Sequence, residues 1–506
     1  MRRAPVEERR FVSDAEKERR ARQRRRRRLA VVGAIAVVVV VGAWRIVVAI
    51  TSPGSCGTGM VVQGTECVGV TDGSHVFYPS LAAVESKITA ENETMQNAGD
   101  FVSVALLTPM TTNPGSDVTL ARIRAELEGA YTAQQYLNGQ GFLPRIRLLL
   151  ANDGSQEQAW PRVVRDLQSA VVSQHLVAVI GVGLSTIPTL QAARALAVGP
   201  DPLPMIGTID TADGLNSKGP SVSLVGSALS GPIQDFARVE PSTGDEVALL
   251  HTYLSRHSPR LLRHVMLVYD TNSQDLYTAT LGEDFRGQFA ANLIGSERYV
   301  GTPGTSAIAN EFNAIASEVC PPGTGTADPP TILYAGRQSL LPALIDQLRG
   351  LSMCPRRTIT IVTGADAEAL PPSATSPNSA GPQISVVYPN LVDPRNLTTP
   401  YKKTFTGLFG TADLGASWGI MTYDAMEAAE QAARAVAGGS ATALPTPAEL
   451  GSALFNFNMP THALDGAAGS FLISADGDEQ CQGLPIVIYR NGTAKIIPPT
   501  LPPGCP

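Results

Sequence analysis

The chain has 506 residues, and its 45 acidic residues outnumber its 39 lysines and arginines, which leaves a net charge of −6. The charge is uneven: residues 1–28 hold 13 basic and 5 acidic side chains, a net charge of +8, so the remainder carries −14. An acidic remainder of this size excludes a nucleic-acid-binding protein, and its length is ample for two domains.

A block of five arginines, 24–28, runs directly into an apolar segment, 29–50. A bilayer-spanning helix needs about 20 apolar residues, and flanking arginines stay in the cytoplasm. We therefore expect an uncleaved single-pass membrane anchor with a cytoplasmic N-terminus and an extracellular chain from about Thr51. A cleaved signal peptide is the alternative, but the segment is long for one and lacks an A-x-A site. A lipid anchor at Cys56 fits poorly, because Pro-Gly-Ser precedes it.

All six cysteines follow this segment, as expected for disulfides in an exported domain. The histidines are scattered and no H-E-x-x-H or Cys/His cluster occurs, so we expect neither a metal nor a cofactor. Six cysteines allow about 15 pairings. The pairing local in sequence joins Cys56 to Cys67, Cys320 to Cys354 and Cys481 to Cys505.

Residues 51–99 are predicted to form an extracellular stalk, with a cysteine hairpin and a polar helix over 79–97. From Phe101 onward, short apolar strands alternate with amphipathic helices, which indicates a parallel sheet covered on both faces. The first series has strands over 101–109, 146–153, 176–183 and 204–208, and helices over 120–138, 158–174 and 187–197.

A second series of the same build follows and predicts a second lobe. A late helix over 417–438 and a closing strand over 484–492 complete the pattern. The second series has strands over 264–271, 296–303, 331–336, 358–366 and 383–390, and helices over 244–257, 276–292, 307–319 and 340–350.

Ligands of open α/β sheets bind beyond the carboxyl ends of the strands. The loop GVGLSTIPT there holds Ser185 and Thr186 at a helix N-terminus, which favours a carboxylate or phosphate. Helix capping is the alternative role of these hydroxyls. Asp366 ends a strand of the second series and would accept an ammonium group, or else be a solvated cap. No nucleophile elbow, Walker loop or other catalytic motif occurs, so we expect a protein that is not an enzyme.

Several segments, in this order, resemble the type I periplasmic substrate-binding proteins of the leucine/isoleucine/valine-binding branch of ABC transport. The resemblance covers roughly 101–492 and implies two doubly wound, Rossmann-like lobes joined by three crossovers, a Venus-flytrap. It is carried by LLLANDGSQEQA, VAVIGVGLSTIPTLQAARALA, LPMIGTIDTADGLN, VMLVYDTNSQDLYTATLGEDF, DGAAGSFLISADGD and LPIVIYRNG.

The resemblance implies an amino acid held between the lobes. By position, Ser185 and Thr186 match the donors to its carboxylate, Thr211 the threonine after the next strand, Tyr277 the second-lobe aromatic, and Asp366 the acceptor of its ammonium. The sequence departs from the family's pattern at two places. Arg337 and Gln338 stand where the family often has an aromatic residue, and Asp210 stands where it has a small one. Either change alters the charge offered to a ligand.

We therefore expect a membrane-anchored extracellular solute-binding protein that captures a small polar ligand, an amino acid or a relative, for an ABC permease. The alternative is a ligand-sensing receptor of the same fold that acts through a signalling partner in the membrane. The predicted divisions are 1–28 (basic arm), 29–50 (anchor), 51–99 (stalk), 100–226 with 391–482 (lobe 1), and 227–390 with 483–506 (lobe 2).

Overall fold

A computed structural model describes most of the chain beyond the predicted membrane segment. The predicted basic arm and anchor, 1–50, and Cys354 lie outside the described residues. Within the described ranges, no helix is both long and apolar enough to cross a membrane. The described residues are 56–199, 201–301, 306–320, 329–351, 357–378, 381–439, 444–499, 501 and 505.

The first lobe is built on a seven-stranded sheet whose strands from β4 to β7 run parallel. Every residue of β3 and β5 is buried, because helices cover both faces. In order across the sheet, the strands are β1 (Met60–Gln63), β2 (Glu66–Thr71), β4 (Arg145–Asn152), β3 (Phe101–Leu107), β5 (Leu176–Gly181), β6 (Met205–Gly207) and β7 (Phe236–Arg238).

The second lobe has a sheet of the same size with an antiparallel pair at one edge. The two largely parallel sheets confirm the α/β class predicted from the alternating pattern. In order, its strands are β17 (Thr493–Ile497), β16 (Ile486–Arg490), β12 (Gln383–Pro389), β11 (Thr358–Thr363), β10 (Thr331–Ala335), β8 (Val265–Asp270) and β9 (Leu293–Tyr299).

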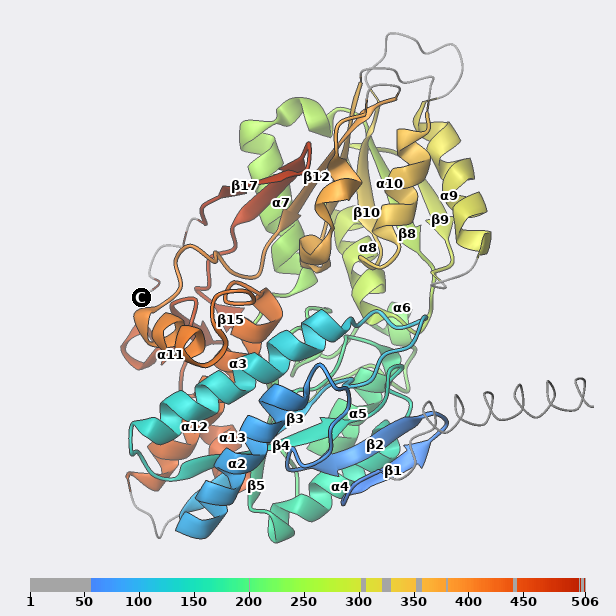
Figure 1. Ribbon diagram of the computed structural model, residues 1–506. Coiled ribbons are helices and arrows are strands. Elements are labelled where there is room, and N and C mark those ends of the chain that lie inside the picture. The colour runs from blue at the N-terminus through green and yellow to red at the C-terminus, as the bar shows by residue number, and fades with distance from the viewer. Residues whose placement is uncertain are drawn as a thin grey trace, which may run out of the picture. The chain divides into compact units, whose positions relative to one another are not determined.

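Helices pack on both faces of each sheet (Figure 1). In the first lobe, α2 (Ala82–Ala98), α3 (Leu120–Gly139), α11 (Thr399–Phe409), α12 (Ser417–Ala437) and α13 (Pro447–Leu454) share one core, and α4 (Trp160–Ser173) and α5 (Ile187–Ala197) share the other. In the second, α7 (Thr243–His257) and α8 (Leu276–Gln288) pack opposite α9 (Ser306–Val319) and α10 (Leu341–Arg349).

Shorter elements complete the description. A small three-stranded sheet follows α13, and single turns of helix lie in the loops. These are β13 (Leu464–Asp465), β14 (Ser470–Ile473), β15 (Glu479–Gln480), α6 (Val222–Val225), η1 (Pro259–Leu262), η2 (Ala365–Ala369), η3 (Pro372–Thr375) and η4 (Pro460–His462).

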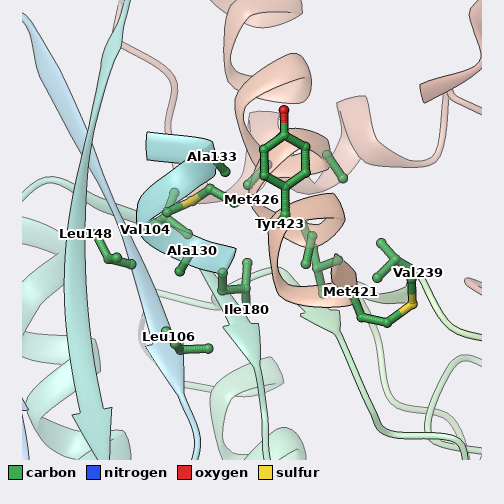
Figure 2. Close-up of a cluster of buried hydrophobic side chains, with 14 of the residues drawn as sticks. Val104, Leu106, Ala130, Ala133, Leu148, Ile180, Val239, Met421, Tyr423 and Met426 are labelled. Atoms are coloured by element: carbon green, nitrogen blue, oxygen red, sulfur yellow. The ribbon is translucent and has the colours of Figure 1, made fainter. Parts of the chain in front are cut away.

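The contact between α3 and α12 forms the centre of the first lobe. Gly129 makes the close approach possible, since a Cβ built there would lie 1.9 Å from the carbonyl oxygen of Gly419. Figure 2 shows side chains of both helices meeting those of the sheet. The labelled ones are Val104, Leu106, Ala130, Ala133, Leu148, Ile180, Val239, Met421, Tyr423 and Met426.

The segment predicted as a separate stalk belongs to the first lobe from residue 57 onward. Strand β2 pairs with β4 in antiparallel register, and Ile88 of α2 is fully buried in the lobe's core. The physical reason is that Val84, Ile88 and Met95 form an apolar stripe at helical spacing. The boundary predicted at residue 226 also shifts, because β7 belongs to the first sheet.

Three connections join the lobes, over 239–242, 390–398 and 481–485, and two of them touch where Asn390 donates to the carbonyl of Pro485. The predicted disulfide between Cys481 and Cys505 is confirmed, with Cα atoms 5.3 Å apart. Cys56, Cys67 and Cys320 are disulfide-bonded as well. The predicted pairings of these three cysteines stay predictions.

Candidate functional site

Loops from the carboxyl ends of strands in both sheets enclose a cavity of about 440 Å³ between the lobes. Loops after β3, β4 and β5 line it from the first lobe, and loops after β8, β9 and β10 from the second. This is the place where open α/β sheets bind ligands. Its polar lining includes Asn113, Asp117, Ser155, Gln156, Glu157, Gln158, Thr186, Asp270, Asn272, Gln274, Asp275 and Arg337.

The loop between β5 and α5 carries two of the predicted ligand donors. Ser185 has a positive φ of 59°, and its carbonyl accepts hydrogen bonds from Leu276 N (3.0 Å) and Tyr277 N (3.1 Å) of the second lobe. Thr186 caps α5, and its side chain accepts from Thr189 N at 3.2 Å. The capping role that the sequence left open is therefore present, and the loop also joins the lobes.

The carboxyl group of Glu157 lies at the position predicted for a ligand's carboxylate. Its Oε1 accepts hydrogen bonds from Leu184 N and Thr189 Oγ1, both at 2.9 Å, and its Oε2 accepts one from the Thr186 hydroxyl. Gly183 makes room for it, since a Cβ there would lie 2.1 Å from Oε1. Burial raises the pKa of Glu157, and these hydrogen bonds oppose that rise.

Arg337 connects the second lobe to the same loop. Its guanidinium holds both oxygens of Asp275, at 2.6 and 2.9 Å, and donates to the carbonyl of Leu184 at 2.7 Å. It also lies over the ring of Tyr277, 4.7 Å from the centroid. Arg337, one of the two departures noted in the sequence, thus places a positive charge of the protein itself between the lobes.

Asp366, the predicted ammonium acceptor, already has a cationic partner in the first lobe. Arg122 Nη1 lies 2.8 Å from its Oδ1, and Gln338 N donates to its Oδ2 at 2.8 Å. Burial opposes ionisation of Asp366, but the charges of Arg122 and Arg337 outweigh it and lower the pKa. Arg122 also stacks on Trp418, 4.2 Å from the ring centroid.

Several solved structures with a similar arrangement of strands and helices are described as solute-binding proteins. A leucine-binding protein from Thermotoga maritima is 16% identical, with a TM-score of 0.54 over 78% of this chain and 97% of that one. A branched-chain amino acid binding protein from Streptococcus pneumoniae, in complex with isoleucine, is 16% identical, with a TM-score of 0.55 over 79% and 100%.

The chain has the type I periplasmic binding protein fold. A solute-binding protein from Rhodopseudomonas palustris with the same fold, in complex with 3,4-dihydroxybenzoic acid, is 15% identical, with a TM-score of 0.53 over 80% and 98%. No protein-family model and no curated protein matches the sequence. At these identities the likeness establishes the fold and leaves the ligand open.

Within this binding-protein fold, the five predicted site residues gather at the lobe interface but contact other protein groups. Ser185 Oγ accepts from Ala212 N at 3.2 Å, and the carbonyl of Thr211 accepts from Thr243 N at 2.7 Å. Tyr277 is buried beneath Arg337. Thr186 is the one member of the set that lines the cavity. The ligand roles of these residues stay predictions.

Two carboxyl groups, one from each lobe, line the cavity outside these internal networks. Asp270 ends β8, and its Oδ1 accepts from Asn272 N (2.8 Å) and Gly301 N (2.7 Å). Burial raises its pKa to about 6, and the charges of Asp275 and Asp117 contribute. Asp117 accepts from Ser339 Oγ at 2.6 Å, and burial raises its pKa also.

Sequence reasoning missed Glu157, Arg122, Asp117 and Asp270. Glu157 stands in the quoted segment LLLANDGSQEQA, in the loop that follows a buried strand. Its position after the carboxyl end of a strand could therefore have marked it as a candidate. Arg122 offered none, because an arginine near the start of an amphipathic helix is ordinary. Among the described residues, no group of three or more His, Cys, Asp and Glu side chains is arranged to hold a metal.

Proposed function

We propose that this protein is an extracellular solute-binding protein, tethered to the membrane by 29–50, that binds a small polar solute between its lobes and delivers it to an ABC-type permease. The cavity of about 440 Å³, lined from both lobes, is the observation that carries the proposal. Cavities of about 300–1,000 Å³ are typical of small-molecule sites. Structures of the same fold hold isoleucine and 3,4-dihydroxybenzoic acid.

The solute in this proposal touches both lobes at once, which favours the closed arrangement. Thr186 and Glu157 border the cavity from the first lobe, and Asp270, Asp275 and Arg337 border it from the second. An amino acid bound in the predicted way has to displace Glu157 from the start of α5 and compete with Arg122 for Asp366. The cavity beside them needs no such displacement, so we place the solute there.

The extracellular location is part of the proposal and has separate support. The Cys481–Cys505 disulfide suits an oxidising compartment, and arginines before an apolar segment favour a cytoplasmic N-terminus. Labelling intact cells with a membrane-impermeant reagent tests it. A cysteine introduced at exposed Ser273 should be labelled, and one introduced at position 10 should not.

A thermal-shift screen of the full-length chain against small polar solutes tests binding. A solute at 100 times its dissociation constant stabilises the folded state by about 2.7 kcal/mol. Gln274→Trp should abolish the shift, because Gln274 is exposed and lines the cavity. Ser273→Trp is the matched control, since it adds the same bulk to the same loop at an exposed residue that does not line the cavity. Equal shifts in both variants would place binding elsewhere.

A ligand-sensing receptor is the second candidate, and the direct bonds between the lobes favour it. The lobes are joined directly by Arg122 with Asp366, Arg337 with Leu184, and Ser185 with Tyr277. A carrier has to open to release its cargo, whereas a sensor can signal from small changes in a closed state. Small-angle scattering separates the two: a radius of gyration that does not change on solute binding supports the sensor.

A further inference from the structure

We propose that the solute bound in the interlobe cavity is a small organic cation, carrying an ammonium or guanidinium group, which is held between Asp117 and Asp270. This inference rests on the proposed solute-binding function and names the chemical class of the solute. It does not depend on whether the solute is transported or sensed.

The lining of the cavity is acidic. It is bordered by Asp117, Glu157, Asp270 and Asp275, and Arg337 is the one basic side chain among the lining residues that the structure describes. Both oxygens of Asp275 are bonded to Arg337, so this pair is neutral as a unit. The remaining carboxyl groups leave the cavity with an excess of negative charge.

Asp117 and Asp270 stand outside the ion pairs of this site, although the charge of Arg337 opposes the rise in the pKa of Asp117. No ion pair joins either of them to a basic side chain in the part of the chain that the structure describes, whereas Asp275 and Asp366 each have an arginine. Asp270 is only 6% exposed. A buried carboxylate without a counter-charge is costly, and a cation placed between the two would relieve that cost.

The site that an anionic or zwitterionic solute would need is already filled. In this fold the start of α5 is the place for a carboxylate, and Glu157 already accepts hydrogen bonds there from the Leu184 N–H and from the hydroxyls of Thr186 and Thr189. A solute's carboxylate in the adjoining cavity would meet Asp117 and Asp270 instead. Like charges within one cavity repel, so the acidic lining favours a solute whose only charge is positive.

The cavity is larger than a metal ion requires. A water molecule takes about 30 Å³ of liquid volume, so about 440 Å³ suits a small organic molecule. The presence of Asn113, Gln156, Gln158 and Asn272 in the lining adds neutral groups that can bond the rest of such a molecule.

Isothermal titration calorimetry on the full-length chain in detergent tests the inference, with putrescine and agmatine as cationic probes. Neutral 1,4-butanediol, anionic succinate, zwitterionic leucine and Mg²⁺ are the comparison probes. The expected result is binding of a cationic probe at least about tenfold tighter than any comparison probe, since one charge-assisted hydrogen bond is worth a factor of that size.

Asp270→Asn and Asp117→Asn should each weaken the binding of the cationic probe by about tenfold or more. Asparagine keeps an oxygen that can accept the backbone bonds of Asp270, so the loop should keep its fold, and circular dichroism checks this. Asp346→Asn on the exposed side of α10 is the matched control and should bind as the parent does.

The outcomes separate this inference from the proposed function. If butanediol, succinate or leucine binds best and Gln274→Trp abolishes that binding, the solute-binding function stands and the cationic class is wrong. If Mg²⁺ alone binds and depends on Asp270, the organic cation is wrong. If no probe binds the parent chain and the Gln274→Trp variant behaves identically throughout, both the function and the class are refuted.

Discussion

Glu157→Ala tests whether the start of α5 is a carboxylate site that the protein fills for itself. The variant removes the acceptor of hydrogen bonds from Leu184 N, Thr186 Oγ1 and Thr189 Oγ1. A hydrogen bond to a charged group contributes about 1.5–3 kcal/mol, and a buried donor left without a partner costs about 1–3 kcal/mol.

Adding up three lost hydrogen bonds would overstate the loss of stability, because the three donors have second partners. Leu184 N also lies 3.2 Å from Thr189 Oγ1, and the two threonine hydroxyls lie 3.1 Å apart. We therefore expect the free energy of unfolding of the first lobe to fall by about 2–4 kcal/mol. Glu157→Gln keeps one acceptor oxygen and should cost less than half as much.

Tryptophan fluorescence during urea unfolding measures this loss, because Trp160 stands at the start of α4, where its backbone N–H donates to the carbonyl of Glu157. Acetate then serves as a test of rescue, since the alanine variant leaves a carboxylate-sized space at the helix N-terminus. Acetate at five times its dissociation constant should restore about 1 kcal/mol. The parent chain, with Glu157 in place, should not respond.

A Glu157→Ala variant as stable as the parent would refute the reasoning, because it would show that the three hydrogen bonds carry no net energy. A destabilised variant that does not respond to acetate, or that responds to chloride as strongly as to acetate, would refute the carboxylate-site assignment alone. Both results are read from the same titration.

Three further predictions concern stability. Arg122→Ala should cost about 3–5 kcal/mol, because it removes the ion-pair partner of Asp366, whose side chain is only 9% exposed. Adding Asp366→Asn should recover part of this loss in a double-mutant cycle, and simple additivity would contradict the pairing. Gly129→Ala should lower the thermal midpoint, because its Cβ would overlap a carbonyl of α12. The control Gly287→Ala has open space around it and should leave the midpoint unchanged or raise it. The reverse order would show that α3 and α12 can separate freely. Burial raises the pKa of Glu126 from 4.5 to about 8, so its contribution to stability is full below pH 4.5 and is lost as the pH rises through about 8. Glu126→Gln should therefore flatten the fall in urea midpoint between about pH 5 and 8, and an unchanged slope would assign the effect to other groups.

The elements of the fold were largely predictable from local sequence. The helix expected over 187–197 runs from Ile187 to Ala197, because Thr186 supplies its cap and the preceding strand ends at Gly181. The strand over 101–109 was recognisable from its apolar run and its final proline. Residues 82–98 were misjudged as part of a stalk, because a short apolar stripe does not reveal which surface covers it.

The candidate site was predictable in place but not in chemistry. Strand order and the rule of carboxyl ends located Ser185, Thr186 and Asp366 at the lobe interface, where the structure has them. The partners of these groups were not predictable, because Arg122 and Asp366 stand 244 residues apart and Glu157 reaches Thr186 across 29.

The sequence by itself determined the series of strands and helices, the two α/β lobes and the edge at which a ligand would bind, because apolar periodicity and helix caps act over a few residues. Only the tertiary structure decided that Glu157, Arg122 and Arg337 occupy the predicted amino-acid positions, and that Asp117 and Asp270 line the cavity beside them. A side chain's electrostatic partner depends on which distant loops are brought within a few ångströms, and nothing local in the chain records that distance.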